Sequence, residues 1–266
     1  MRKYLYSFKL YLVSSLQYRF DTVLSLVMSN ISMLVTILFW MVIYRSNRTE
    51  VINGYTITDM ITFFVVSSLF RTFILNGGGF EISGLIKSGE LSKALIKPHS
   101  INMFLYWKYL SSALFEFLKQ FLLLLLIVPF FTGYLTWDIS VHSVILLILH
   151  LLTSTVISHL IWFLLGMMAF WLEQAQAVMW SFAVILNFLS GMFMPLDFFP
   201  RWSVRVLEFM PFAVFSYIPA KIYMNQITFT EGVSLLVVYI SWVLVFIVLN
   251  SIVWKAGVKK YSAIGG

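Results

Sequence analysis

The sequence predicts an all-α, polytopic membrane protein, and composition is the first reason. Of the 266 residues, 61% are hydrophobic and only 11% are charged, and the mean hydropathy is +0.91. Soluble domains carry about 25% charged residues, so a soluble globular protein is excluded. The apolar residues also form unbroken blocks such as 121–131. A transmembrane β-barrel instead needs segments of about ten residues that alternate apolar and polar positions.

Crossing a bilayer takes about 20 mostly apolar residues, and six segments meet that requirement. They cover residues 22–44, 57–75, 109–132, 143–171, 175–197 and 233–254. Residues 1–21 come first and, as a helix, would separate polar from aromatic side chains, which predicts an amphipathic interfacial helix; the alternative is an extension of the first span into water. We therefore expect a six-helix transmembrane domain over 22–266, without a cleavable signal peptide.

Basic residues orient the protein, because Lys and Arg concentrate in cytoplasmic loops. The side with both termini carries Arg2, Lys3, Lys9, Arg19, Lys87, Lys93, Lys97, Lys108, Lys255, Lys259 and Lys260, and the other side carries Arg45, Arg48, Arg201, Arg205 and Lys221. Both termini should therefore be cytoplasmic, in a cytoplasmic membrane. The net charge of +7 reflects this topology, so we expect contacts with membrane lipids and no nucleic-acid partner.

Two loops are longer than a connection needs. The cytoplasmic loop 76–108 contains apolar residues at helical spacing between Phe80 and Ile86, with Lys87 in the last turn and Gly89 as a stop, which predicts a short helix. The extracellular segment 195–232 has four prolines but stays apolar. We expect short, re-entrant helices there, with their backbone buried against protein.

Catalytic and metal-binding patterns are missing from the sequence. Residues 84–90 read GLIKSGE, which has the glycine spacing of a phosphate-binding loop but places Glu90 where that loop needs lysine. His150 and His159 lie on opposite faces of one predicted helix. The chain has no cysteine. We therefore predict no catalytic residue, no metal and no cofactor bound by this chain.

Charged residues in the predicted spans should be paired or reach water. Glu116 and Lys119 are three residues apart and should form an ion pair. That pair either lines an interior pathway or neutralises itself near the interface. Arg71 and Glu173 are expected at the cytoplasmic ends of their spans, extending to water.

Three motifs carry a resemblance to the permease subunit of type-2 ATP-binding-cassette exporters. Residues 89–91 (GEL) with 94–98 (ALIKP) resemble a stretch of that family's first inner loop, residues 190–202 with 211–212 are similar to its segment after the fifth span, and residues 261–266 (YSAIGG) resemble its C-terminus. The order of spans and loops agrees along essentially the whole chain.

The resemblance implies a dimer, with the same or a similar permease, that rests on two ATPase subunits, which bind ATP and Mg. It also implies a coupling helix that docks into the ATPase, made here of Phe80, Glu81, Ile82, Leu85, Ile86, Lys87 and Gly89. We expect Ile82, Leu85 and Ile86 to be exposed for docking; the alternative is packing on the permease's own inner surface.

The family's export path runs between the protomers along the second and fifth spans. The resemblance therefore places Phe63, Phe64, Phe70, Phe73, Phe182, Asn187, Phe188 and Met192 on that path, with ordinary helix packing as the alternative for each. We predict an ATP-driven exporter, in a bacterium, of an amphipathic, lipid-like, peptide or drug-like cargo. Two alternatives stay open: a lipid-modifying membrane enzyme using Glu116, His150, His159 or Glu173, and a proton-coupled carrier.

Overall fold

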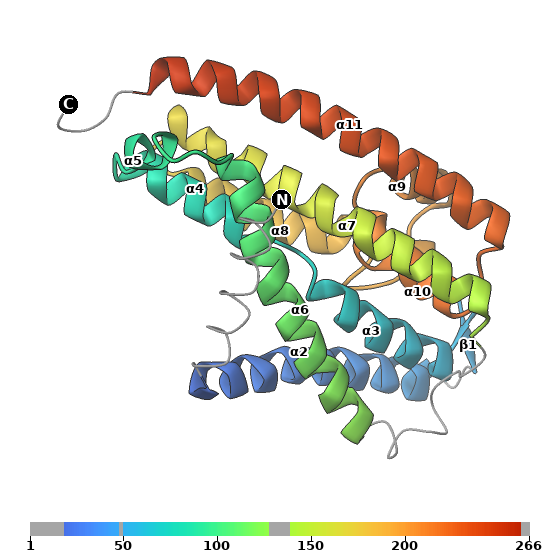
Figure 1. Ribbon diagram of the computed structural model, residues 1–266. Helices are drawn as coiled ribbons and strands as arrows, with labels where there is room; N and C mark the ends of the chain where they lie inside the picture. The colour runs from blue at the N-terminus through green and yellow to red at the C-terminus, as the bar shows by residue number, and fades with distance from the viewer. Residues whose placement is uncertain (1–18, 48–49, 128–138, 262–266) are drawn as a thin grey trace.

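The computed structural model describes residues 19–47, 50–127 and 139–261 (Figure 1). Most of the predicted interfacial helix 1–21 and most of the C-terminal motif 261–266 lie outside these residues. The described part is helical apart from one small hairpin, which confirms the all-α prediction.

The described residues form α-helices, short 3-10 helices and two strands. They are α2 (Arg19–Asn47), β1 (Val51–Ile52), β2 (Tyr55–Thr56), α3 (Ile57–Arg71), α4 (Gly77–Lys87), α5 (Leu91–Leu95), α6 (Ile101–Ile127), α7 (Val141–Met167), η3 (Met168–Phe170), α8 (Ala175–Leu189), η4 (Leu196–Phe198), α9 (Arg201–Phe209), η5 (Ala213–Phe215), α10 (Tyr217–Tyr223) and α11 (Phe229–Lys260). Each predicted span contains or overlaps one of the longer helices.

Helix α7 is the centre of the molecule, because α11, α4, α8 and α10 all pack on it. In Figure 1 α11 runs beside α7, while α2 and α6 lie on another side of the bundle. Among the described residues, the stretches Val141–Phe170 and Phe229–Lys260 are long and apolar enough to cross a membrane by length and composition. The count of six spans therefore stays a prediction.

The second predicted span, 57–75, is helical only as far as Arg71. Helix α3 ends at Arg71, and the chain then follows α7 in the same direction: the Leu75 N–H donates to Ser158 Oγ at 2.8 Å, and Gly79 and Ile82 lie against Gly166. Helix α4 thus continues the path of α3 along the second half of α7. The assignment of 76–108 to a cytoplasmic loop stays a prediction.

Local sequence signals set where several helices begin. Thr56 and Asp59 form a capping box at the start of α3, and Thr228 and Glu231 form another at the start of α11. Each box satisfies backbone N–H groups that have no partner in the first turn. Before α3, the β1–β2 hairpin turns at Asn53 and Gly54, both with positive φ, as two-residue hairpin turns require.

The segment after α8 is a run of short helices, as the prolines predicted. It contains η4, α9, η5 and α10, and residues 213–220 are all buried. Their apolar side chains join the main core around Trp162, Met179 and Tyr239. This burial explains why a loop-length segment is so apolar.

Candidate functional site

The predicted coupling helix is a helix, but the expected exposure of its isoleucines is wrong. Ile82 is 0% exposed and Ile86 is 7% exposed, and both pack with Leu105, Phe163 and Met167. Backbones approach closely at this contact, since a Cβ on Gly79 would lie 2.3 Å from the Trp162 carbonyl oxygen. The alternative considered from the sequence, packing on the protein's own surface, holds for both isoleucines.

The remaining predicted coupling residues also face the bundle in part. Leu85 and Phe80 are half-buried, and Phe80 contacts Trp162 and Trp180. Glu81 accepts from Lys108 Nζ at 2.6 Å and from the Tyr109 hydroxyl at 2.7 Å. Glu81 therefore fastens α4 to α6, and Lys87 is the exposed member of this set.

The exposed apolar side chains of this region lie instead at the end of α5. Leu91 is fully buried and anchors the helix, whereas Leu95 is 43% and Ile96 84% exposed, with Lys93 and Lys97 beside them. Leu95 and Ile96 thus form a small exposed apolar patch that is flanked by lysines. We name residues 93–98 the inner tip.

The inner tip is tied to the C-terminal end of the described chain. The Tyr261 hydroxyl donates to the Gly89 carbonyl oxygen at 2.7 Å and lies 3.3 Å from Ser92 Oγ. Gly89 has a φ of +77°, which glycine adopts without strain. Two motifs that are 172 residues apart in sequence thus meet in space. The other residues of that C-terminal motif, 262–266, lie outside the described residues.

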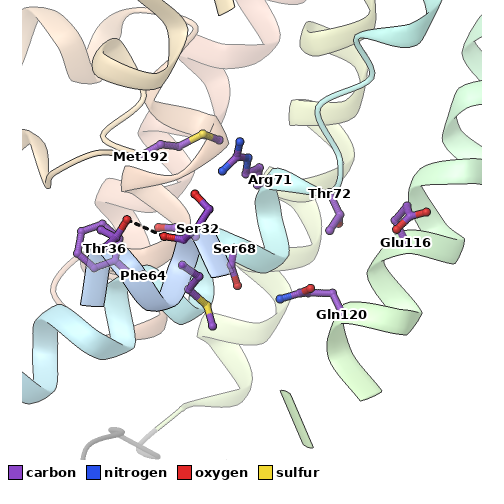
Figure 2. Close-up of a pocket in the computed structure, with 11 residues that line it drawn as sticks. Ser32, Thr36, Phe64, Ser68, Arg71, Thr72, Glu116, Gln120 and Met192 are labelled. Carbon is purple, nitrogen blue, oxygen red and sulfur yellow. Dashed lines mark hydrogen bonds between the residues drawn. The ribbon is translucent and has the colours of Figure 1, made fainter. Parts of the chain in front are cut away.

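A polar cavity of about 260 Å³ lies between α2, α3 and α6 (Figure 2). It is lined by Ser32, Met33, Thr36, Phe64, Ser67, Ser68, Arg71, Thr72, Glu116, Gln120 and Met192. Most of these side chains are polar, although the helices that carry them are apolar. Polar groups that converge inside apolar helices mark ligand or ion pathways in membrane proteins. We name this space the polar cavity.

Arg71 is placed by the packing of the segment that follows it. It ends α3, but four residues later Leu75 is hydrogen-bonded to Ser158, which lies close to the middle of the apolar stretch 141–170. The expectation that Arg71 sits at the cytoplasmic end of its span stays a prediction. Its side chain is exposed at the mouth of the cavity.

The predicted pair of Glu116 and Lys119 is confirmed, with 2.5 Å between Lys119 Nζ and Glu116 Oε1. Glu116 lines the polar cavity. Beside it, Gln120 and the buried Asn30 exchange two side-chain hydrogen bonds of 3.0 Å. The ion pair lies within α6, whereas the amide pair joins α6 to α2.

The predicted path residues divide into covered and open groups. Phe63, Phe64 and Phe73 are at most 4% exposed within the single chain, and Phe188 is 46% exposed. Phe70, Phe182, Asn187 and Met192 are half-buried. Of the whole set, the polar cavity brings together Phe64 and Met192. The assignment of a path along α3 and α8 stays a prediction.

A second polar cluster lies at the opposite end of the molecule from the inner tip. Asp197 accepts from the Tyr55 hydroxyl, from the Tyr217 hydroxyl at 2.8 Å and from Lys221 Nζ at 3.1 Å. We name these four residues the outer cluster. Burial, and then the Asp197 carboxylate, raise the pKa values of Tyr55 and Tyr217 above the usual value. Both hydroxyls therefore stay protonated donors.

The two histidines considered from the sequence, His150 and His159 of α7, have separate hydrogen-bond partners. His150 hydrogen-bonds the Leu146 carbonyl oxygen at 2.9 Å, and His159 Nε2 hydrogen-bonds Asn102 Oδ1 at 2.5 Å. Within the described residues, no three His, Cys, Asp or Glu side chains form a group that fits a metal ion. Glu173 is exposed in the turn before α8.

Sequence reasoning missed the hydroxyl residues of the polar cavity and the exposure of Ile96. Ser67, Ser68 and Thr72 lie close together in sequence at the end of α3, near Arg71. Hydroxyl-rich stretches inside an apolar segment are the available signal. It is weak, because Ser and Thr in helices also bond to their own backbone.

Comparison with known families gives one result. A family model described as "ABC-2 family transporter protein" matches residues 30–265, which is most of the chain. A comparison with curated proteins gives no match.

Proposed function

Because the chain belongs to the ABC-2 transporter family and is thus a membrane-integral transport subunit, we propose that it is the permease of an ATP-driven exporter. Permeases of this family work with a separate ATPase. Here two ATPase subunits, which bind ATP and Mg, would drive two permease chains, the same or related, in a bacterial cytoplasmic membrane. The cargo would be an amphipathic, lipid-like, peptide or drug-like molecule.

The observation that carries this proposal is the inner tip. Ile96 is 84% exposed, and burying an Ile or Leu side chain contributes about 1.5–3 kcal/mol. A rigid apolar knob flanked by lysines suits a groove with an acidic rim on a partner protein. The tip replaces Ile82 and Ile86 as the docking element that we propose.

The connections of the tip give it a way to move the membrane helices. Leu91 and Ile86 share one core with Phe163 and Phe170, and Glu81 ties α4 to α6. A displacement of the tip by the ATPase would thus pass as a rigid-body motion to α4 and α6. Arg71 and Glu116, on either side of the polar cavity, would move with these elements.

Topology completes the proposal. Helices α2, α6, α7, α8 and α11 and the broken pair α3–α4 would each cross the membrane, with both termini cytoplasmic. Figure 1 places α5 and the end of α11 at one end of the molecule and the β1–β2 hairpin at the other, which supports this orientation. The short helices after α8 would then lie in the outer leaflet.

The first experiment tests the tip with its cognate ATPase in proteoliposomes. We expect Ile96→Glu to lower stimulation of ATP hydrolysis about tenfold or more, because a carboxylate cannot enter an apolar groove without losing its hydration. Val51→Glu is the matched control, since Val51 is also an exposed apolar residue, 53% open, in the hairpin. Normal stimulation by Ile96→Glu, or cargo transport without any ATPase, would contradict the proposal.

Orientation has its own test, because the chain has no cysteine. Lys97→Cys should react with a membrane-impermeant maleimide from the cytoplasmic side alone, and Val51→Cys from the outside alone. The reverse pattern would place the tip on the wrong side for an ATPase.

A further inference from the structure

The polar cavity is lined by a cation, Arg71. Among the described residues, Arg71 forms no ion pair, whereas Glu116, which lines the same cavity, is already paired with Lys119 at 2.5 Å. The guanidinium therefore keeps five N–H donors for another group. The Arg71 side chain is exposed at the mouth of the cavity, so an anionic ligand can reach it.

The cavity also presents hydrogen-bond acceptors. The hydroxyls of Thr36, Ser68 and Thr72 donate to the carbonyl oxygens of Ser32, Val65 and Leu69 at 2.7–3.0 Å. Their oxygen lone pairs stay available, and all three side chains line the same cavity as Arg71, whose guanidinium points toward Met192 in Figure 2. A ligand that bears its own hydroxyl or ammonium donors would match them.

The cavity wall and its mouth fit a molecule with an apolar part. Met33, Phe64 and Met192 form the apolar side of the wall. Ser32 is exposed at the mouth, and its neighbours on α2 include Ile31 and Val35, which are 47% and 59% exposed. A headgroup inside the cavity would thus leave its tail beside an open apolar helix face.

We propose that the polar cavity binds the anionic, hydroxyl-bearing headgroup of an amphiphile, with Arg71 holding the anionic oxygen atoms. The anion is held by charge-assisted hydrogen bonds, which a guanidinium forms in pairs with phosphate or carboxylate. The hydroxyls of α2 and α3 accept from the headgroup. As a statement about cargo, this inference rests on the proposed export function; as a statement about binding, it stands on the cavity alone.

The test measures binding to the full-length chain by native mass spectrometry, without ATPase or nucleotide. The probes are dioctanoyl phosphatidylglycerol, dioctanoyl phosphatidylcholine and glycerol 1-phosphate. We expect phosphatidylglycerol to bind about tenfold more tightly than phosphatidylcholine. Arg71→Gln should weaken phosphatidylglycerol binding at least about tenfold, as the loss of a charged hydrogen bond predicts. Arg201→Gln, which changes an exposed arginine of α9, should bind like the unmodified chain.

A second variant keeps the test decisive if Arg71→Gln does not fold. Thr36→Val retains the shape of the side chain and all charges, and it should lower the preference for phosphatidylglycerol several-fold. Glycerol 1-phosphate binding as tightly as the lipid would support the headgroup chemistry with a free anion as its source. Equal binding of both lipids, or an equal loss in Arg201→Gln, would overturn the proposal.

Failure here is distinguishable from failure of the export proposal. If the chain binds phosphatidylglycerol selectively but Ile96→Glu still stimulates ATP hydrolysis normally, only the proposal that the inner tip docks on the ATPase is contradicted. If Ile96→Glu lowers the stimulation of ATP hydrolysis as expected but the chain binds both lipids equally, only the proposal for the polar cavity is contradicted.

Discussion

The outer cluster and the polar cavity are both polar sites in an apolar bundle, but their hydrogen bonding differs. In the outer cluster, three donors converge on one carboxylate, Asp197. In the polar cavity, Arg71 has no ion pair among the described residues, and the hydroxyls turn back to their own helices. A satisfied cluster stabilises the fold, whereas an unsatisfied one is available to a ligand. The comparison therefore separates a structural site from a binding site.

The largest effect is expected from removing the acceptor of the outer cluster. Asp197→Ala leaves Lys221, Tyr55 and Tyr217 without their partner, so the free energy of unfolding should fall by about 3 kcal/mol or more. Denaturation in mixed detergent micelles measures it. Asp197→Asn keeps an acceptor and should lose less. An unchanged unfolding midpoint for Asp197→Ala would show that this cluster does not hold the hairpin to the outer segment.

Alkaline pH should weaken the same cluster by the next largest amount. Because the pKa values of Tyr55 and Tyr217 are raised in the folded chain, their contribution is complete below the unfolded pKa of about 10 and is lost as the pH rises above it. Two tyrosines predict a loss of roughly 2.5 kcal/mol between about pH 9 and about pH 11.

The control for the pH dependence is the double variant Tyr55→Phe with Tyr217→Phe. It removes both titrating hydroxyls, so its stability should be lower at neutral pH but should fall less between the same two pH values. A parallel decline in the variant would assign the alkaline loss to other groups.

A smaller effect is expected at the edge of the polar cavity. Gln120→Leu breaks the reciprocal amide pair with Asn30, and hydrogen bonds between membrane helices contribute about 1 kcal/mol. The unfolding midpoint should shift accordingly. Leu124→Ala, one turn further along α6 and also buried, gives the loss in stability that removal of a packed side chain causes in the same region. A loss of about 3 kcal/mol for Gln120→Leu, as expected for Asp197→Ala, would remove the contrast between the two sites.

The smallest effect on stability is expected at Arg71. Arg71→Leu removes a cation without an ion pair among the described residues, so stability should change by no more than about 0.5 kcal/mol, although headgroup selectivity is lost. A large destabilisation would mean that Arg71 has a structural role like that of Lys221. The comparison between the two sites would then fail.

Several parts of the fold follow from neighbouring residues and could be predicted. Apolar blocks gave the helices, four prolines gave the short helices of 195–232, and the spacing of Glu116 and Lys119 gave their ion pair. Capping residues such as Thr228 mark a helix start in the sequence itself. Interactions within one or two turns depend on local spacing alone, which is why the sequence is sufficient for them.

Other parts depend on contacts between distant segments. Ile82 and Ile86 are buried because α4 docks on α7, where Gly79 and Gly166 let the two backbones meet. That docking also extends the path of α3 beyond Arg71, whose side chain lines the polar cavity together with hydroxyls of α2 and α3. Helical periodicity predicts an apolar face but not what covers it.

The amino-acid sequence by itself determined that this chain is a helical membrane protein, where its helices lie and which family's motifs it carries, since composition, periodicity and short-range pairing are local properties. The tertiary structure alone decided that Ile96 and not Ile82 is the exposed knob, that Tyr261 supports it through Gly89, and that Arg71 opens into a polar cavity. The physical reason is that burial and depth are set by which helices pack together, and those contacts join residues far apart in the chain.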